Sequence, residues 1–132
     1  MPAHVTVLFP FVPADDIDET ALRILFDGFP AFDFELDRAE TFDNGVVWLH
    51  PEPSSPFVDL TAEVQQRWPA YPPYEGVFDE VLPHVTVSET PLDLDLALPI
   101  RARATEVALY EEDEATGSWS VRARFPLAQG VA

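Results

Sequence analysis

In the first thirty residues, a nearly continuous apolar segment is followed by apolar positions at helical spacing. Residues 4–11 form an apolar run that ends before Pro13, which predicts a buried strand. Asp16, with Glu19 three residues later, predicts the start of a helix, and Gly28 is placed to cap its end. The apolar positions of this helix recur every three or four residues: Ile17, Ala21, Ile24, Leu25 and Phe29.

The pattern then changes to a period of two. Apolar and acidic residues alternate over residues 32–37, which predicts a half-buried strand. Asp43-Asn44-Gly45 is a tight-turn sequence, so this strand and residues 46–50 are predicted to form a hairpin. Ser55-Pro56, a cap residue followed by a first-turn proline, predicts a second helix. Its apolar face consists of Phe57, Leu60, Val64 and Trp68.

The second half of the chain reads as strands. A loop rich in proline and aromatic residues, 69–83, leads into a predicted strand at 84–87. Alternating leucines predict another strand over 92–98. Residues 100–110 and 118–125 are predicted to pair as a hairpin across a polar turn. The order strand, helix, hairpin, helix, strand, hairpin predicts an α+β fold with mainly antiparallel sheets.

Composition limits the classes of function. With 132 residues and no evident linker, we expect one domain over residues 1–132. The chain has no cysteine, so disulfides, cysteine metal sites and thiol nucleophiles are excluded. Its 24 acidic and 7 basic residues give a net charge of −17, which argues against binding a long nucleic-acid duplex. Without an apolar run of membrane length or a basic-apolar leader, we expect a cytoplasmic protein that contacts no membrane.

One tetrapeptide occurs twice, as His4-Val5-Thr6-Val7 and as His84-Val85-Thr86-Val87. In a strand, residues i and i+2 share a face and lie about 6–7 Å apart, so each copy places an imidazole beside a hydroxyl. The repetition suggests two equivalent halves about an approximate two-fold axis. Two such strands facing each other would offer two titratable bases and two hydroxyl donors to one small anion. This predicts a phosphodiester site that needs no metal or other cofactor.

Other interpretations of the same residues remain open. A strand histidine can be a packed core residue, and either threonine can reflect β-propensity alone. Zinc is the competing functional interpretation, but its sites usually carry a third protein ligand, and neither motif has a typical metal-ligand spacing. His50, the third histidine, precedes Pro51 at a strand end, and we expect it at the surface.

Substrate-binding candidates lie outside the motifs. Arg122 and Arg124 share a strand face and could bind phosphate, although pairing with neighbouring carboxylates is an equal alternative. Tyr71, Tyr74 and Phe78 precede the second motif and could stack on a base, with packing of the loop as the alternative.

The paired His-x-Thr-x strands resemble the 2H phosphoesterase superfamily, in particular the branch of 2′-5′ RNA ligase-like proteins and RNA 2′,3′-cyclic phosphodiesterases. The likeness covers nearly the whole chain. Besides the motifs, it rests on segments 2–11, 29–34, 51–53, 71–74, 78–80 and 122–127.

This resemblance implies a two-lobed α+β fold with two outer helices, an approximate two-fold axis, and His4 and His84 in a central cleft. It implies hydrolysis of 2′,3′-cyclic phosphates, with His84 as base, His4 as acid, and Thr6 and Thr86 holding the phosphate. The reverse reaction would join RNA ends through 2′-5′ linkages.

Two departures from the family pattern bear on the expected fold. The chain begins close to its first motif, without the strand and helix that usually precede it, and residues 89–99 read as extended where relatives place a helix. An edge strand could therefore need covering, by the leucine-rich segment of the same chain or of a partner in a homodimer. The alternative function is a catalytically weak module that binds a nucleotide or an RNA end.

Overall fold

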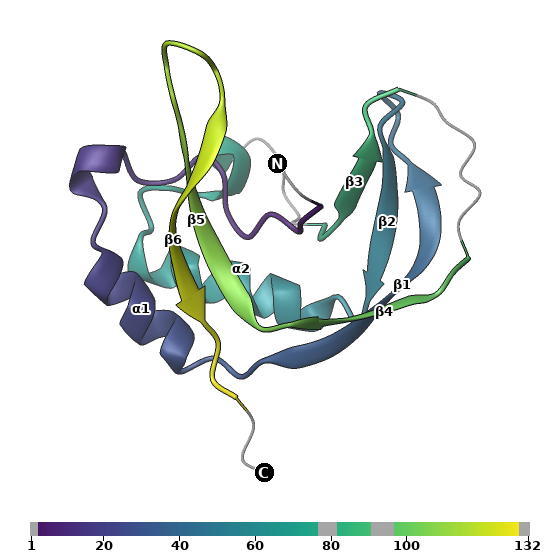
Figure 1. The fold of residues 1–132 in the computed structure, drawn as a ribbon, viewed down its shortest axis with the longest axis horizontal. Helices are drawn as coiled ribbons and strands as arrows, with labels where there is room; N and C mark the ends of the chain where they lie inside the picture. The colour runs from purple at the N-terminus through teal and green to yellow at the C-terminus, as the bar shows by residue number, and fades with distance from the viewer. Residues whose placement is uncertain (1–2, 77–81, 91–96, 130–132) are drawn as a thin grey trace. The chain divides into compact units, whose positions relative to one another are not determined.

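The computed structural model shows two compact units (Figure 1). The residues that it describes are 3–76, 82–90 and 97–129. Unit 1 is built from Val12–Phe32 and Arg103–Ala132, and unit 2 from Pro2–Phe11 and Asp33–Ala102. The predicted two-lobed α+β fold, with two helices and antiparallel sheets, is confirmed.

Unit 1 packs helix α1 (Glu19–Asp27) against a two-stranded antiparallel sheet. The strands are β5 (Glu106–Glu112) and β6 (Trp119–Pro126). The apolar side of α1 is buried, and the ring of Phe26 lies 5.9 Å from that of Phe125, which is 1% exposed. These contacts give unit 1 its own small core.

Helix α1 begins two residues later than the sequence predicted. Asp18 is the N-cap, and its carboxylate accepts a hydrogen bond of 3.0 Å from the backbone N–H of Ala21. The predicted capping box at Asp16 is wrong, because Asp16 ends a short 3-10 helix, η1 (Ala14–Asp16), ahead of α1. Gly28 is confirmed as the C-terminal cap.

Unit 2 holds a four-stranded sheet in the order β3-β2-β1-β4. The strands are β1 (Phe32–Thr41), β2 (Val47–Glu52), β3 (Val85–Ser88) and β4 (Ile100–Ala104). The hairpin of β1 and β2 is confirmed, as is the second helix, α2 (Ser55–Arg67), with its proline in the first turn (Figure 1).

Helix α2 packs on one face of this sheet and holds the N-terminal segment. The ring of Phe57 meets that of Phe34 on β1 edge-on, with centroids 5.0 Å apart. The buried hydroxyl of Thr61 donates a hydrogen bond of 2.6 Å to the carbonyl oxygen of Val7. Just after α2, the ring of Trp68 lies 5.4 Å from that of Phe11. The first histidine motif is therefore tied to unit 2 through α2.

Two predicted strands differ from the structure. Residues 4–11 do not form a strand: among these eight residues only Val5 makes a β-bridge, and Pro10 has no N–H to donate. Residues 100–110 are not one strand either, since the chain breaks at Thr105, whose carbonyl accepts a hydrogen bond from Leu127. The break sends β4 and β5 into different sheets. Most of the predicted leucine strand, residues 92–96 of 92–98, lies outside the described residues.

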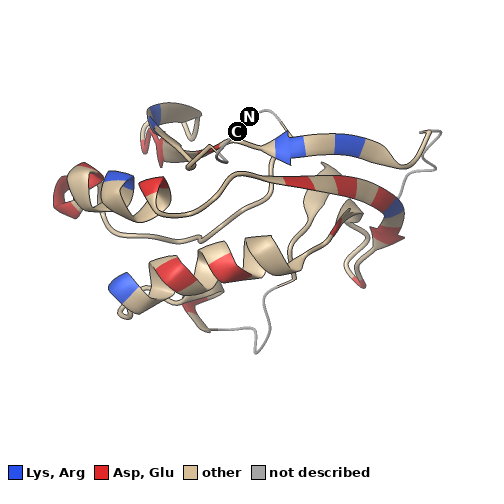
Figure 2. Ribbon diagram, turned by 90° about the horizontal axis from the view of Figure 1, so that it is seen from below, with Lys and Arg blue, Asp and Glu red and all other residues tan. Residues whose placement is uncertain are grey.

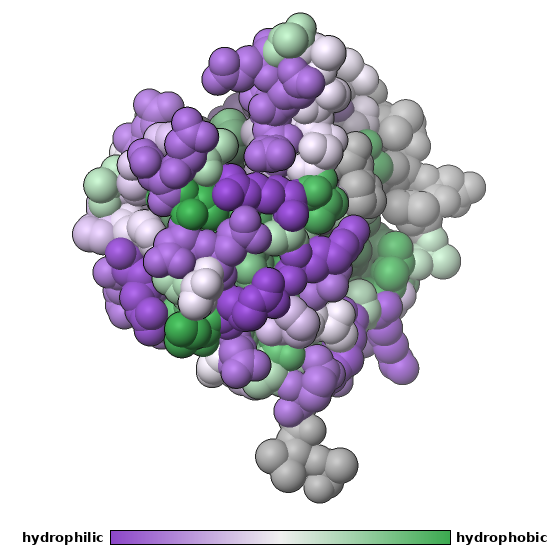
Figure 3. Space-filling model, turned by 60° about the vertical axis from the view of Figure 1, so that its left-hand side comes forward, coloured by the Kyte–Doolittle hydropathy of each residue, from purple (hydrophilic) through white to green (hydrophobic). Residues whose placement is uncertain are grey.

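The surface is strongly acidic. Figure 2 shows acidic positions recurring along the ribbons of β1 and α2, in keeping with the net charge of −17. On the face drawn in Figure 3, hydrophobic side chains form small separate patches among hydrophilic ones. Among the described residues, no helix has the length and apolar character needed to cross a membrane.

Candidate active site

The two His-Val-Thr-Val segments lie side by side in unit 2. Val5 and Val85 form an antiparallel β-bridge. Continuing this register by one residue in each direction sets His4 opposite Thr86, and Thr6 opposite His84. The strand alternation that the sequence predicts would put these four residues on the face opposite to the two valines. The bridge brings the two motif segments together, and the pairing of their imidazole and hydroxyl groups stays a prediction.

The two faces differ in character. On the valine face, Val85 is opposite Leu49 of β2, and both are buried. Of the four motif residues, Thr6 and His84 are half-buried, while His4 and Thr86 are exposed. A water molecule or a phosphate can reach exposed groups, so this second face is the one suited to chemistry.

Aromatic rings surround His84. Trp48 of β2 is opposite Thr86, and its ring centroid lies 6.0 Å from that of His84. Phe42 stacks on Trp48 at 4.8 Å and meets His84 edge-on at 5.3 Å. The indole N–H of Trp48 is buried and has no hydrogen-bond partner among the described residues. These rings restrict the orientations open to the His84 imidazole.

A backbone contact fixes the tautomer of His84. Its Nδ1 lies 2.8 Å from the carbonyl oxygen of Leu82. A carbonyl oxygen can only accept, so Nδ1 carries the proton and the neutral ring has its lone pair on Nε2. His84 is therefore arranged to accept a proton at Nε2.

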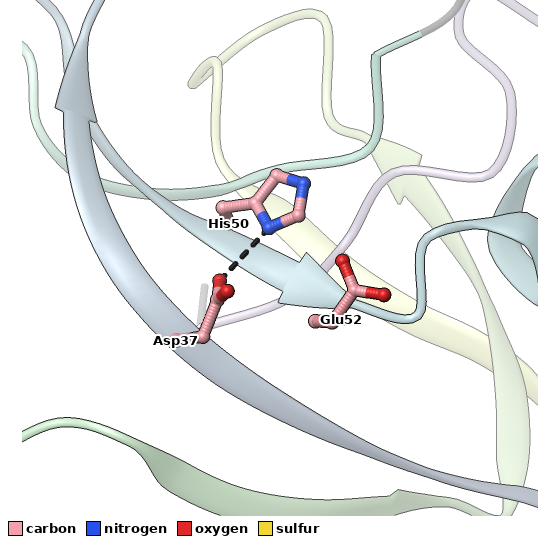
Figure 4. Close-up of side chains that lie close together, drawn as sticks. All are labelled: Asp37, His50 and Glu52. Carbon is pink, nitrogen blue, oxygen red and sulfur yellow. Dashed lines mark hydrogen bonds and ion pairs between the residues drawn. The ribbon is translucent and has the colours of Figure 1, made fainter.

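The expectation that His50 lies at the surface is wrong. His50 is 8% exposed and sits inside β2, two residues after Trp48, with ring centroids 6.3 Å apart. Its Nδ1 is 2.9 Å from Oδ1 of Asp37 on β1 (Figure 4). The hydrogen bond with His50 holds the pKa of Asp37 below its ordinary value. The prediction for His50 was wrong because β2 does not end at His50 but continues through Pro51 to Glu52.

Sequence reasoning also missed Phe42, Trp48 and Asp37. The period-two series Trp48, His50, Glu52 directly after the predicted turn was the available signal, since it puts three polar-tipped side chains on one face. Asp37 belongs to the alternating series of residues 32–37, but its position against His50 depends on a β-bulge between Leu36 and Arg38 that the sequence does not indicate.

The two candidate arginines are held by acidic residues of unit 1. Nε of Arg122 donates to Glu19 at 3.2 Å, and its Nη1 donates to the carbonyl oxygen of Ala14 at 2.8 Å. Arg124 pairs with Glu106. This arrangement favours a structural role for both arginines, and their contact with phosphate stays a prediction.

The aromatic candidates belong to the loop before β3. Tyr74 lies in η2 (Pro73–Gly76), and its backbone N–H donates to the carbonyl oxygen of Phe9 at 2.6 Å. Its side chain is half-buried, and burial raises the pKa of its phenol. The ring of Tyr71 lies 6.3 Å from that of Phe11. Phe78 lies outside the described residues.

Comparison with known proteins identifies the family. The family model of the 2′-5′ RNA ligase superfamily matches residues 1–123, and the chain belongs to this superfamily of phosphoesterases and ligases. The resemblance to 2H phosphoesterases is thereby confirmed. A search of the curated proteins gave no match.

Solved structures share the fold. E. coli LigT complexed with 3′-AMP has a TM-score of 0.69 and 22% identity, covering 96% of this chain and 78% of LigT. LigT complexed with NADP+ has a TM-score of 0.68 and 25% identity, covering 96% and 77%. A protein of Thermus thermophilus has a TM-score of 0.67 and 20% identity, covering 96% and 79%.

Proposed function

We propose that this protein is a metal-independent phosphodiesterase that opens 2′,3′-cyclic phosphates on RNA ends or small nucleotides. The observation that supports the proposal is the antiparallel Val5–Val85 bridge, which brings the two His-Val-Thr-Val segments side by side. Two imidazoles can hold opposite protonation states near neutral pH, which is the requirement for paired acid and base catalysis.

In the proposed reaction, one histidine removes a proton from water as the water oxygen attacks phosphorus. The bond from phosphorus to one ribose oxygen breaks, and the other histidine protonates that oxygen, leaving a phosphate monoester. The hydroxyls of Thr6 and Thr86 donate hydrogen bonds to the non-bridging phosphate oxygens, where negative charge increases in the transition state. If the 5′-hydroxyl of a second RNA end replaces water as the nucleophile, the bond from phosphorus to the ribose 3′ oxygen breaks and a 2′-5′ linkage forms.

We assign His84 as the base and His4 as the acid. The contact of His84 Nδ1 with Leu82 supports this assignment, because it leaves the Nε2 lone pair of the neutral ring able to take a proton from water. The aromatic contacts of Phe42 and Trp48 with this imidazole support a fixed direction for that lone pair.

The nature of the ligand follows from charge and from the relatives. E. coli LigT has been solved with 3′-AMP, NADP+ and ATP. A net charge of −17 disfavours a long duplex, so we assign a mononucleotide or a single RNA end as the substrate. We further expect the protein to act in the cytoplasm. A homodimer is one expected form of the protein, and size-exclusion chromatography tests it.

The test is a substrate screen with purified protein, with and without EDTA. It compares 2′,3′-cyclic nucleotides, 2′-5′-linked dinucleotides and an ADP-ribose cyclic phosphate. We expect turnover of a cyclic phosphate that EDTA does not reduce. Saturable nucleotide binding without turnover would instead support a binding module, and loss of turnover in EDTA with rescue by a divalent ion would replace the two-histidine mechanism.

A further inference from the structure

A second cluster of polar side chains occupies the hairpin of β1 and β2. Asp37, His50 and Glu52 each offer one ligand atom, and these atoms all lie within 4.8 Å of one another (Figure 4). The His50 side chain is only 10% exposed, and its Nδ1 faces Oδ1 of Asp37 at 2.9 Å. The motif histidines His4 and His84 are not part of this cluster.

The strand register explains how three ligands converge. Asp37 sits in the bulge of β1 opposite the Pro51–His50 step of β2, so its carboxylate turns to the side on which His50 lies. Glu52 is two residues beyond His50 and therefore projects from the same face of β2. Rigid strands, rather than a loop, set the spacing of all three groups.

The charges around the cluster favour a cation. Glu52 is directly opposite Glu35, and like charges in opposed positions destabilise an antiparallel pair. Glu35 pairs with Arg101 at 3.2 Å, whereas Glu52 has no ion-pair partner among the described residues. Arg38 is the nearest competing cation: its Nη1 lies 3.3 Å from Oδ2 of Asp37, and its Nε is bonded to Glu40. Oδ1 of Asp37 remains directed at His50.

We propose that Asp37, His50 and Glu52 bind one zinc ion, separate from the phosphodiester chemistry. One imidazole nitrogen and two carboxylate oxygens, completed by water, form a four-coordinate set that suits zinc, whereas magnesium prefers six oxygen ligands. Ligands about 2.1 Å from a tetrahedral zinc lie roughly 3.4 Å apart, so Asp37 and His50 need to separate by only about 0.5 Å. The ion would join β1 to β2 and relieve the repulsion at Glu52.

The test measures zinc binding to the full chain after chelator treatment and dialysis, by calorimetry, together with the thermal unfolding temperature. We expect one zinc per chain, a higher unfolding temperature with zinc, and no comparable effect of magnesium at equal concentration. Glu52→Gln should weaken zinc binding at least tenfold, as should Asp37→Asn. Glu63→Gln, which removes the same charge from an exposed position of α2, should keep the affinity within about twofold.

His84→Ala tests whether the zinc site is independent of the motif histidines, and we expect the zinc affinity of this variant to equal that of the parent chain. Loss of zinc binding in His84→Ala but not in Glu52→Gln would overturn the proposal, and so would the absence of saturable binding. All these readouts are independent of turnover, so their failure leaves the proposed phosphodiesterase function untouched.

Discussion

Val5 pairs with Val85 in an antiparallel bridge, and this single pairing aligns the two copies of the histidine motif. A one-residue bridge is a weak connection by itself. Its position therefore depends on the anchors of the two segments: Thr61 of α2 holds Val7, and β2 pairs with β3. The geometry of the candidate site thus rests on residues that take no part in its chemistry.

Thr61 is the first test of this dependence. Thr61→Val keeps the shape but leaves the carbonyl of Val7 without its donor, which should cost about 1–3 kcal/mol in urea unfolding. Turnover should fall as well, because the first motif is released. Thr61→Ser retains the hydroxyl and should keep most of the parent chain's stability and turnover. Equal stability and turnover in the valine and serine variants would show that the hydrogen bond does not position the motif.

The motif threonines should act on the transition state. Thr6→Val and Thr86→Val each remove one donor to phosphate and should lower kcat/KM by about 10²–10³-fold with little change in stability. Thr41→Val, at the exposed end of β1, is the matched control and should leave kcat/KM unchanged. If Thr86→Val behaves like Thr41→Val, the threonine does not contact the phosphate.

The candidate site was predicted from a motif with a period of two, and the Val5–Val85 bridge brings the two copies of that motif together. Residues 84–87 lie in or beside strand β3, whereas residues 4–11 are held mainly by α2 and a single bridge. The hydrophobic pattern alone does not distinguish these two arrangements. The pairing of His50 with Asp37 could not be predicted, because the β-bulge between Leu36 and Arg38 shifts the register of the hairpin without any mark in the sequence. Fold class followed from periodicity; strand breaks such as Thr105 follow from tertiary hydrogen bonds.

The start of α1 offers a stability test. Asp18→Ala removes the N-cap acceptor of the Ala21 N–H and should cost about 1 kcal/mol, within a range of roughly 0.5–2 kcal/mol. Asp16→Ala removes an exposed carboxylate from η1 and should change stability by less than about 0.5 kcal/mol. Denaturant unfolding of both variants shows which aspartate caps α1. A larger loss of stability in Asp16→Ala than in Asp18→Ala would support the capping box that the sequence predicted.

Tyr74 should make stability fall at alkaline pH. Burial raises the pKa of its phenol in the folded protein, while in the unfolded chain the group ionises near pH ~10. Above about pH 10 the unfolded state therefore loses a proton that the folded state keeps, and stability decreases as pH rises towards the folded pKa. Tyr74→Phe should reduce this decrease. Urea unfolding at neutral and alkaline pH measures it, and an identical decrease in parent and variant would contradict the assignment.

The hydrolysis rate of 2′,3′-cyclic nucleotides tests the central claim most directly, measured as a function of pH for the parent chain, His4→Ala and His84→Ala. The two-histidine mechanism predicts a bell-shaped profile for the parent and a loss of about 10²–10⁴-fold in each variant, because each removes one general acid or base. A parent chain that hydrolyses no cyclic nucleotide, or a histidine variant with near-parental rates on every substrate the parent cleaves, would contradict it.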